Sequence, residues 1–190
     1  MHNLPLWQWA MWSWYAVAIV WAISAVRVKT AKSTQPLGPR LAYSIVIGCA
    51  FAMLFYDRLR IGSLREGFLP HDVWIARIGV LLCFAGAAVA IWARAILGKN
   101  WSARVSLKVD HQLIRSGIYA YIRHPIYTGF LLMVIGTAVV QGEFRGLLAI
   151  PVVAIGLTIK AKQEEELLRN EFGESYSQYC RESGFLLPRF

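Results

Sequence analysis

The chain has 190 residues, of which 57% are hydrophobic and only 16% are charged. An average soluble domain has roughly 25% charged residues, so this composition excludes a disordered chain, a coiled coil and an ordinary soluble enzyme. The net charge of +9 does not indicate nucleic-acid binding, because the Lys and Arg residues stand between long apolar runs, as topology signals do. We expect an all-α integral membrane bundle of about five transmembrane helices, in one domain over residues 1–190.

Three apolar runs occupy the first half of the chain. The first, residues 6–26, carries no charge and begins with a cluster of tryptophans, which is typical of a membrane interface. No Lys or Arg precedes this run, so it does not have the pattern of a signal peptide. The second and third runs are residues 41–56 and 73–97. Arg77 and Arg94 lie near the two ends of the third run, where both can extend to the membrane interfaces.

The second half of the chain begins with a polar, basic loop that is too long for a tight turn. This loop covers residues 99–124 and is followed by an uncharged run at 125–142. The next uncharged stretch, 146–159, is too short to cross a bilayer alone, so we expect its helix to continue through Lys160 and Glu164 into the aqueous phase. These two helices form a C-terminal hairpin. We expect residues 1–97 to supply three transmembrane helices and residues 98–190 to form the catalytic half.

The distribution of basic residues predicts the orientation in the membrane. The segments 27–40, 94–123 and 160–190 together carry 15 Lys and Arg, whereas the loops 57–72 and 143–145 carry 4. Cytoplasmic loops of membrane proteins are enriched in basic residues. The N-terminus is therefore expected outside, and the C-terminus and the basic loops in the cytoplasm.

The cysteines and histidines do not predict a metal site. Cys49, Cys83 and Cys180 are far apart and form no CxxC pair, and the four histidines show no HxxxH spacing. We expect neither a disulfide framework nor a bound metal.

Four short motifs fall on the predicted cytoplasmic side. In chain order they are HQLIRSGIY at 111–119, RHPIYTG at 123–129, EEELL at 164–168 and FGESYSQY at 172–179. Because the long loop and the end of the last helix lie on the same side, their polar residues can meet over the membrane surface. Glu164 can attract a cationic ligand, and the helix that starts at Pro125 offers backbone N–H groups to a carboxylate. Tyr119 and Tyr127 can supply flat apolar walls.

This ordered set resembles the isoprenylcysteine carboxyl methyltransferase family, which is related to the membrane phospholipid N-methyltransferases. The resemblance covers residues 101–179. It implies a site for S-adenosyl-L-methionine without a Rossmann fold, and the chain indeed has no GxGxxG motif. The cofactor-binding residues that the resemblance implies are Arg104, His111, Gln112, Leu113, Ile114, Gly117, Tyr119, His124, Pro125, Ile126, Tyr127 and Glu164.

The resemblance also implies a lipid-linked acceptor, most simply the carboxylate of a prenylated cysteine. Lys160 stands where the eukaryotic members have an arginine that faces this carboxylate, and Arg104 stands where they usually have a glutamine. Lys160 keeps the positive charge but loses the bidentate geometry of arginine. We expect Lys160 to orient the acceptor. Besides the lipid-linked substrate, we expect the protein to interact with the bilayer, and we expect no nucleic acid or metal as a partner.

Three alternatives stay open at this point. A phospholipid amine N-methyltransferase would need a base near the sulfonium, and Glu165 or His124 could serve. A sterol reductase-like enzyme would bind a nicotinamide cofactor, although such chains are usually longer. A non-enzymatic membrane protein, such as an assembly factor or small transporter, is the third alternative, but a transporter usually places ionisable residues in the middle of its helices.

Overall fold

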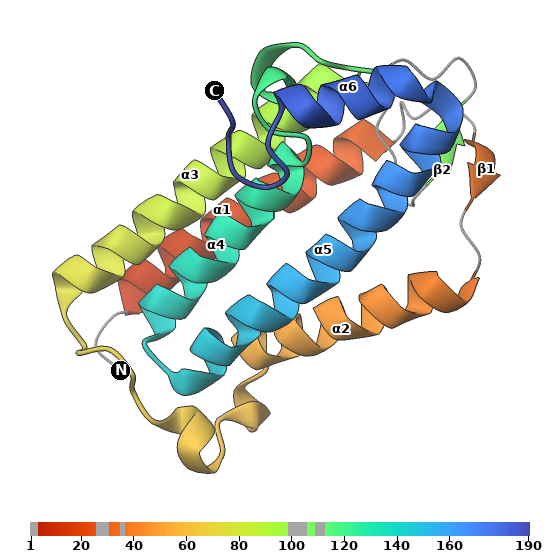
Figure 1. Cartoon of the computed structure of the whole chain (residues 1–190). Helices are drawn as coiled ribbons and strands as arrows, with labels where there is room; N and C mark the ends of the chain where they lie inside the picture. The colour runs from red at the N-terminus through yellow and green to blue at the C-terminus, as the bar shows by residue number, and fades with distance from the viewer. Residues whose placement is uncertain (1–3, 26–30, 35–36, 99–105, 109–112) are drawn as a thin grey trace.

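The computed structural model describes residues 4–25, 31–34, 37–98, 106–108 and 113–190, and it is almost entirely helical (Figure 1). The expectation of an all-α fold is confirmed for these residues. The long helices lie over the predicted apolar runs, and the helix of the last run extends past Lys160 and Glu164, as predicted. The helices are α1 Leu4–Ala25, α2 Leu37–Phe55, α3 Val73–Leu97, α4 Pro125–Gln141, α5 Phe144–Phe172 and α6 Glu174–Glu182.

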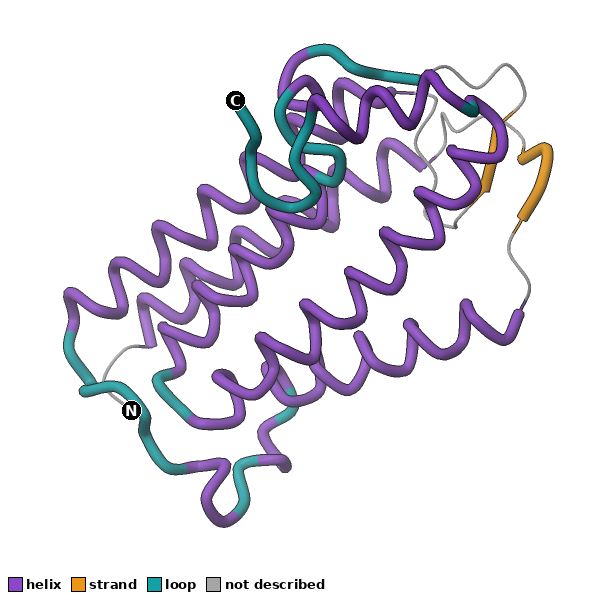
Figure 2. Tube along the Cα trace, viewed as in Figure 1, coloured by secondary structure: helices purple, strands orange, loops and turns teal. Residues whose placement is uncertain are grey.

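The sequence did not predict the small sheet. Strand β1, Ala31–Thr34, pairs antiparallel with β2, Ser106–Lys108, so the sheet joins the two basic loops that were expected to share one side. Figure 2 shows both strands at the end of the bundle where α6 lies. We call this end the site end.

The opposite end of the bundle, which we call the far end, holds the other two loops. The Phe68 N–H donates to the Gly142 carbonyl at 2.8 Å, and the Phe144 N–H donates to the Glu66 carbonyl at 3.0 Å. The short 3-10 helices η1, Asp57–Leu59, and η2, Gly62–Arg65, belong to this end. The separation of the loops between two ends agrees with the predicted topology.

Helices α3 and α4 pack closely because glycines face each other along the contact. A Cβ atom placed on Gly79 would lie 2.7 Å from the Gly136 carbonyl oxygen, and one on Gly129 would lie 2.6 Å from the Gly86 carbonyl oxygen. Both distances are too short for a carbon atom, so only glycine fits. Small residues at helix contacts are typical of membrane bundles, where they let the backbones approach.

Much of the helix surface is apolar and faces outward. Helices α3 and α5 are long and apolar enough to cross a membrane, and only 33% of the most apolar window of α3 is buried. Ile78, Leu81 and Ile155 are each more than half exposed. A core helix of a soluble protein would bury most of such a surface, so the exposure is typical of a helix that faces lipid.

The two arginines of α3 differ from each other. Arg77 is exposed, as predicted, and its guanidinium lies 4.4 Å from the ring centroid of Trp74. Arg94 is only 4% exposed, and it donates to the carbonyls of Gly98 and Ser24. The prediction that Arg94 extends to the membrane interface is therefore wrong, because its side chain joins the end of α3 to α1.

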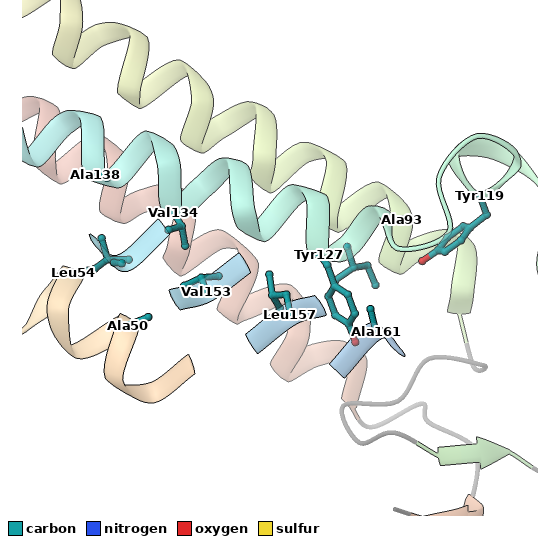
Figure 3. Close-up of a cluster of buried hydrophobic side chains, with 12 residues drawn as sticks. Ala50, Leu54, Ala93, Tyr119, Tyr127, Val134, Ala138, Val153, Leu157 and Ala161 are labelled. Carbon is teal, nitrogen blue, oxygen red and sulfur yellow. The ribbon is translucent and has the colours of Figure 1, made fainter. Parts of the chain in front are cut away.

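The main apolar core lies between α2, α4 and α5 (Figure 3). Leu54 lies at one end of this core, with Val134 and Val153 next to it, and each of the three is at most 2% exposed (Figure 3). Tyr127 lies toward the opposite end beside Ala161, and its hydroxyl points toward α5 (Figure 3). The core thus fixes α4 against α5 at the level where the polar motifs begin.

Candidate functional site

The site is organised around the start of α4. His124 is the N-cap residue and Pro125 is the first helical residue, a position that suits proline because its missing N–H has no intrahelical acceptor there. His124, Pro125, Ile126 and Tyr127 are all buried. The sequence motif therefore places a rigid, buried turn at the site end of α4.

Tyr127 connects this turn to α5. Its hydroxyl donates a 2.5 Å hydrogen bond to Oε1 of Glu164, and Oε2 of the same carboxylate lies 3.7 Å from Nδ1 of His124. The rings of His124 and Tyr127 are stacked, with 5.5 Å between their centroids and an interplanar angle of 3°. The carboxylate of Glu164 is thereby fixed in position, and its side chain remains 24% exposed.

The neighbouring carboxylate has different partners. Oε1 of Glu165 lies 2.7 Å from Nε of Arg123 and 3.2 Å from Nε2 of His124. Glu166 is exposed to solvent. The acidic cluster is therefore not a uniform charged surface, because Glu164 and Glu165 are held by the RHPIYTG motif and Glu166 is not.

Arg123 also binds the C-terminal segment, residues 183–190. Its guanidinium donates to the carbonyl of Ser183, which begins this segment, and to that of Cys180 in α6. Burial lowers the pKa of Arg123, but its hydrogen bond and charge interaction with Glu165 outweigh burial and raise the pKa overall. Arg123 is thus a permanent cation between Glu165 and the C-terminal segment.

The C-terminal segment continues along the start of α4. The backbone N–H groups of Arg123 and His124 donate to the carbonyls of Gly184 and Phe185, at 2.8 and 3.2 Å. The Phe185 ring meets the His124 ring edge-on, with centroids 5.1 Å apart. Sequence reasoning missed this segment, since its bonds use backbone carbonyls and no motif marks them.

The first turn of α4 offers fewer N–H groups than expected. The N–H groups of Tyr127 and Thr128 both donate to the His124 carbonyl, and that of His124 is taken by Phe185. Because Pro125 has no N–H, Ile126 is the residue of this turn whose N–H can meet a ligand. The sequence led us to expect several free backbone N–H groups at the start of α4. In this turn, the structure leaves the N–H of Ile126 for a ligand.

Tyr119, in the short helix η4 at Gly117–Ala120, is held by α6. The hydroxyl of Tyr179 donates to the Tyr119 carbonyl at 2.6 Å, and burial raises the pKa of Tyr179 to about 12. Tyr179 therefore remains a neutral hydrogen-bond donor at neutral pH. Tyr176 and Tyr179 are 1% and 4% exposed, so both rings pack in the interior.

Lys160 lies one helical turn before Glu164, on the same face of α5. Its Nζ is 5.4 Å from the centroid of the Tyr127 ring and 5.6 Å from that of Tyr43 on α2. A cation near aromatic faces is stabilised by their quadrupoles. The predicted acceptor-orienting residue and the predicted cofactor-binding Glu164 thus both contact Tyr127, Lys160 at the ring and Glu164 at the hydroxyl.

The remaining predicted residues fall into two groups. Leu113 and Ile114 are half-buried, and Ile114 packs against the main core. Gly117 has φ +60°, a conformation that favours glycine. Arg104, His111 and Gln112 lie outside the described residues. Over the described part of the chain, no three His, Cys, Asp or Glu side chains are grouped to hold a metal ion.

Comparison with known proteins identifies the relatives of this arrangement. Residues 78–170, which contain α4 and most of α3 and α5, match the model of the isoprenylcysteine carboxyl methyltransferase (ICMT) family. The chain belongs to this family. The matched range ends before the C-terminal segment that completes the α4 turn.

Individual relatives agree with the family model. A protein-S-isoprenylcysteine O-methyltransferase of Schizosaccharomyces pombe is 39% identical, over 70% of this chain and 56% of the relative. One of Tribolium castaneum is 30% identical, over 60% of this chain and 42% of the relative. This chain thus spans only about half the length of these two relatives.

A solved structure is also similar. It is described as the eukaryotic intramembrane Ras methyltransferase isoprenylcysteine carboxyl methyltransferase, and it is 26% identical with a TM-score of 0.55. The similarity covers 81% of this chain and 54% of that chain. The shared architecture therefore extends beyond the residues matched by the family model.

Proposed function

We propose that this protein is an integral membrane methyltransferase that transfers a methyl group from S-adenosyl-L-methionine to a lipid-linked carboxylate of the isoprenylcysteine type. One observation carries the proposal: the Glu164 carboxylate is fixed by Tyr127 and His124, with the Lys160 ammonium one turn away. A cationic donor and an anionic acceptor need charges of opposite sign at neighbouring places, and this arrangement supplies both.

The residues of the site fit the cofactor. A cationic part requires an anion, which Glu164 supplies from a partly exposed side chain. The Ile126 N–H at the start of α4 suits a carboxylate. Tyr119 and the half-buried Leu113 and Ile114 suit an apolar ring system. When bound, S-adenosyl-L-methionine supplies a methyl group on a positively charged sulfur.

The reaction needs orientation more than proton transfer. The acceptor carboxylate is already ionised at neutral pH, and its oxygen forms a bond to the methyl carbon as the carbon–sulfur bond breaks. The electron pair of that bond stays on sulfur, and no proton is released. A general base is not required, which agrees with the engagement of Glu165 by Arg123 and His124. Lys160 holds the acceptor and reduces its desolvation cost.

The membrane provides the acceptor. In this proposal, five helices of one domain cross the bilayer, with the N-terminus outside and the site end in the cytoplasm. The lipid part of the acceptor stays in the bilayer, while its carboxylate reaches Lys160 at the end of the apolar part of α5. The polar cofactor arrives from the cytoplasm at the catalytic half, residues 98–190.

Calorimetry on the detergent-purified protein tests the cofactor. S-adenosyl-L-methionine should bind, and NADPH should not; binding of NADPH alone would contradict the proposal. Methyl transfer is then measured with a prenylcysteine-like acid and with phosphatidylethanolamine as acceptors. Turnover of the acid supports the carboxylate assignment, whereas turnover of the amine alone would replace it by phospholipid N-methylation.

A further inference from the structure

A second candidate site lies at the far end of the bundle, opposite the motifs described above. A cavity of about 750 Å³ is bounded there by α1, α2 and the loops before α3 and α5. Cavities of about 300–1,000 Å³ are typical of small-molecule sites. Arg145, which borders this cavity, precedes Glu164 on α5 by about 28 Å of helix, so the cavity is separate from the proposed methyl-transfer site.

The walls of the cavity are apolar and largely aromatic. One face of α1 supplies Trp7, Met11, Trp14, Tyr15 and Ala18, and α2 supplies Phe51 and Phe55. The α1 residues recur at helical spacing and cover about 16 Å of the helix. This gives the cavity the elongated apolar surface that an acyl chain requires.

The cavity opens to the outside of the bundle along α1. Tyr15, at its edge, is 55% exposed, and Ala18 is exposed as well. The neighbouring outward residues Trp12 and Ile19 are 61% and 58% exposed and apolar. In a chain whose helices face lipid, an opening in such a surface leads into the bilayer.

One end of the cavity, where the loops before α3 and α5 meet, carries charged side chains of both signs. Arg145 is buried and fully engaged, because it bonds Glu143 and the carbonyls of Met53 and Tyr56. Arg60 is different: its Nη2 lies 2.6 Å from Glu143, and its side chain is 46% exposed. Asp57 lies 3.5 Å from Arg145 and is 85% exposed. One accessible cation and one accessible anion therefore stand at the polar end of an apolar cavity.

We infer that this cavity binds one molecule of a zwitterionic phospholipid with a primary amine, of the phosphatidylethanolamine type, from the leaflet at the far end. The acyl chain lies between α1 and α2, the phosphate meets Arg60 and the ammonium meets Asp57. Paired charges of opposite sign match a zwitterion, whereas an anionic lipid would leave Asp57 facing like charge. The bound lipid fills the space between α1 and α2; it is not the methyl acceptor.

Native mass spectrometry tests this inference, with the full chain released from nanodiscs of equal parts phosphatidylethanolamine, phosphatidylcholine and phosphatidylglycerol. The wild type should retain one phospholipid, with phosphatidylethanolamine in excess. Ala18→Trp fills the cavity and should reduce retention at least about tenfold, because the acyl chain loses its place. Ala16→Trp adds the same ring to an exposed α1 position outside the cavity and should leave retention unchanged.

The headgroup is tested separately. Asp57→Asn should abolish the preference for phosphatidylethanolamine over phosphatidylcholine, and Arg60→Gln should weaken retention of both about tenfold or more, as expected for a lost charge-assisted bond. Equal retention by the wild type and Ala18→Trp, or retention of detergent alone, would overturn the inference. S-adenosyl-L-methionine binding by Ala18→Trp should remain at the wild-type level, so failure of this inference and failure of the proposed function are distinguishable.

Discussion

The hydroxyl of Tyr127 on α4 lies 2.5 Å from Oε1 of Glu164 on α5, although the two residues are 37 positions apart in the sequence. This bond joins the RHPIYTG motif to the acidic motif, and it orients the carboxylate to which the proposed function assigns the cationic part of the cofactor. We therefore expect substitutions of Glu164 and of Tyr127 to weaken cofactor binding to different extents.

Glu164→Gln should weaken S-adenosyl-L-methionine binding by roughly 10- to 150-fold, because a charge-assisted interaction contributes about 1.5–3 kcal/mol. Isothermal calorimetry measures the change, and circular dichroism verifies that the variant is folded. Glu166→Gln is the matched control, since this neighbour is exposed. An equal loss in both variants would mean that the cluster acts only as a charged surface.

Tyr127→Phe should weaken cofactor binding less than Glu164→Gln, by about tenfold or less, because the carboxylate remains but loses one of its partners. The double variant should be no weaker than Glu164→Gln alone, since the hydroxyl acts through the carboxylate. A double-mutant cycle by calorimetry measures this coupling. Fully additive losses would show that Tyr127 acts independently of Glu164.

Lys160→Met should raise the apparent KM for a prenylcysteine-like acid while cofactor affinity changes little, because the ammonium is assigned to the acceptor. Lys160→Arg should retain much of the activity, since it preserves the charge near Tyr127. Steady-state kinetics with both substrates varied separates the two effects. Unchanged acid turnover in Lys160→Met would contradict the carboxylate assignment.

Gly184→Ala should detach the C-terminal segment from the start of α4. A Cβ at this position would overlap the Leu187 carbonyl, so we expect a loss of stability of about 1–3 kcal/mol and weaker cofactor binding. Thermal unfolding and calorimetry measure the two effects. Gly48→Ala, at a helical position with nothing near the added carbon, is the control; the same melting temperature in both variants would contradict the role of the segment.

Labelling of single cysteines tests the orientation in the membrane. In a cysteine-free background, Ser63→Cys at the far end should react with an impermeant reagent added outside intact cells, and Ser175→Cys near the start of α6 should not. Both residues are exposed, so access depends on the side of the membrane. Labelling of Ser175→Cys from outside would reverse the topology and remove the site from the cytoplasm.

The sequence predicted those parts of the fold that depend on local patterns. The apolar runs predicted the long helices, and the short run at 146–159 required the extension of α5 that the structure has. Arg94 was misplaced because its position near the end of an apolar run does not reveal that the Ser24 carbonyl lies beside it. The β1–β2 pairing was missed for a similar reason, since short polar strands carry no periodic signal.

The site was predictable to the extent that motifs mark side chains. Tyr127, His124 and Glu164 were predicted as one group, and the structure brings them together. The pairing of Arg123 with Glu165 was not predicted, because an isolated acidic residue at a helix end usually faces solvent. The backbone contacts of residues 183–190 had no side-chain signal at all.

The glycine contacts between α3 and α4 have a consequence for the lipid environment of the protein. Gly79 meets Gly136 and Gly86 meets Gly129, so any sliding of one helix along the other would drive side chains into backbone. The position of Tyr127 along the bundle axis is therefore fixed by the packing of α4 against α3, and it cannot adapt to the thickness of the bilayer. Hydrophobic mismatch in a thicker or thinner bilayer must then be accommodated by tilting of the whole bundle or by deformation of the lipid. Activity in vesicles should accordingly depend on acyl-chain length.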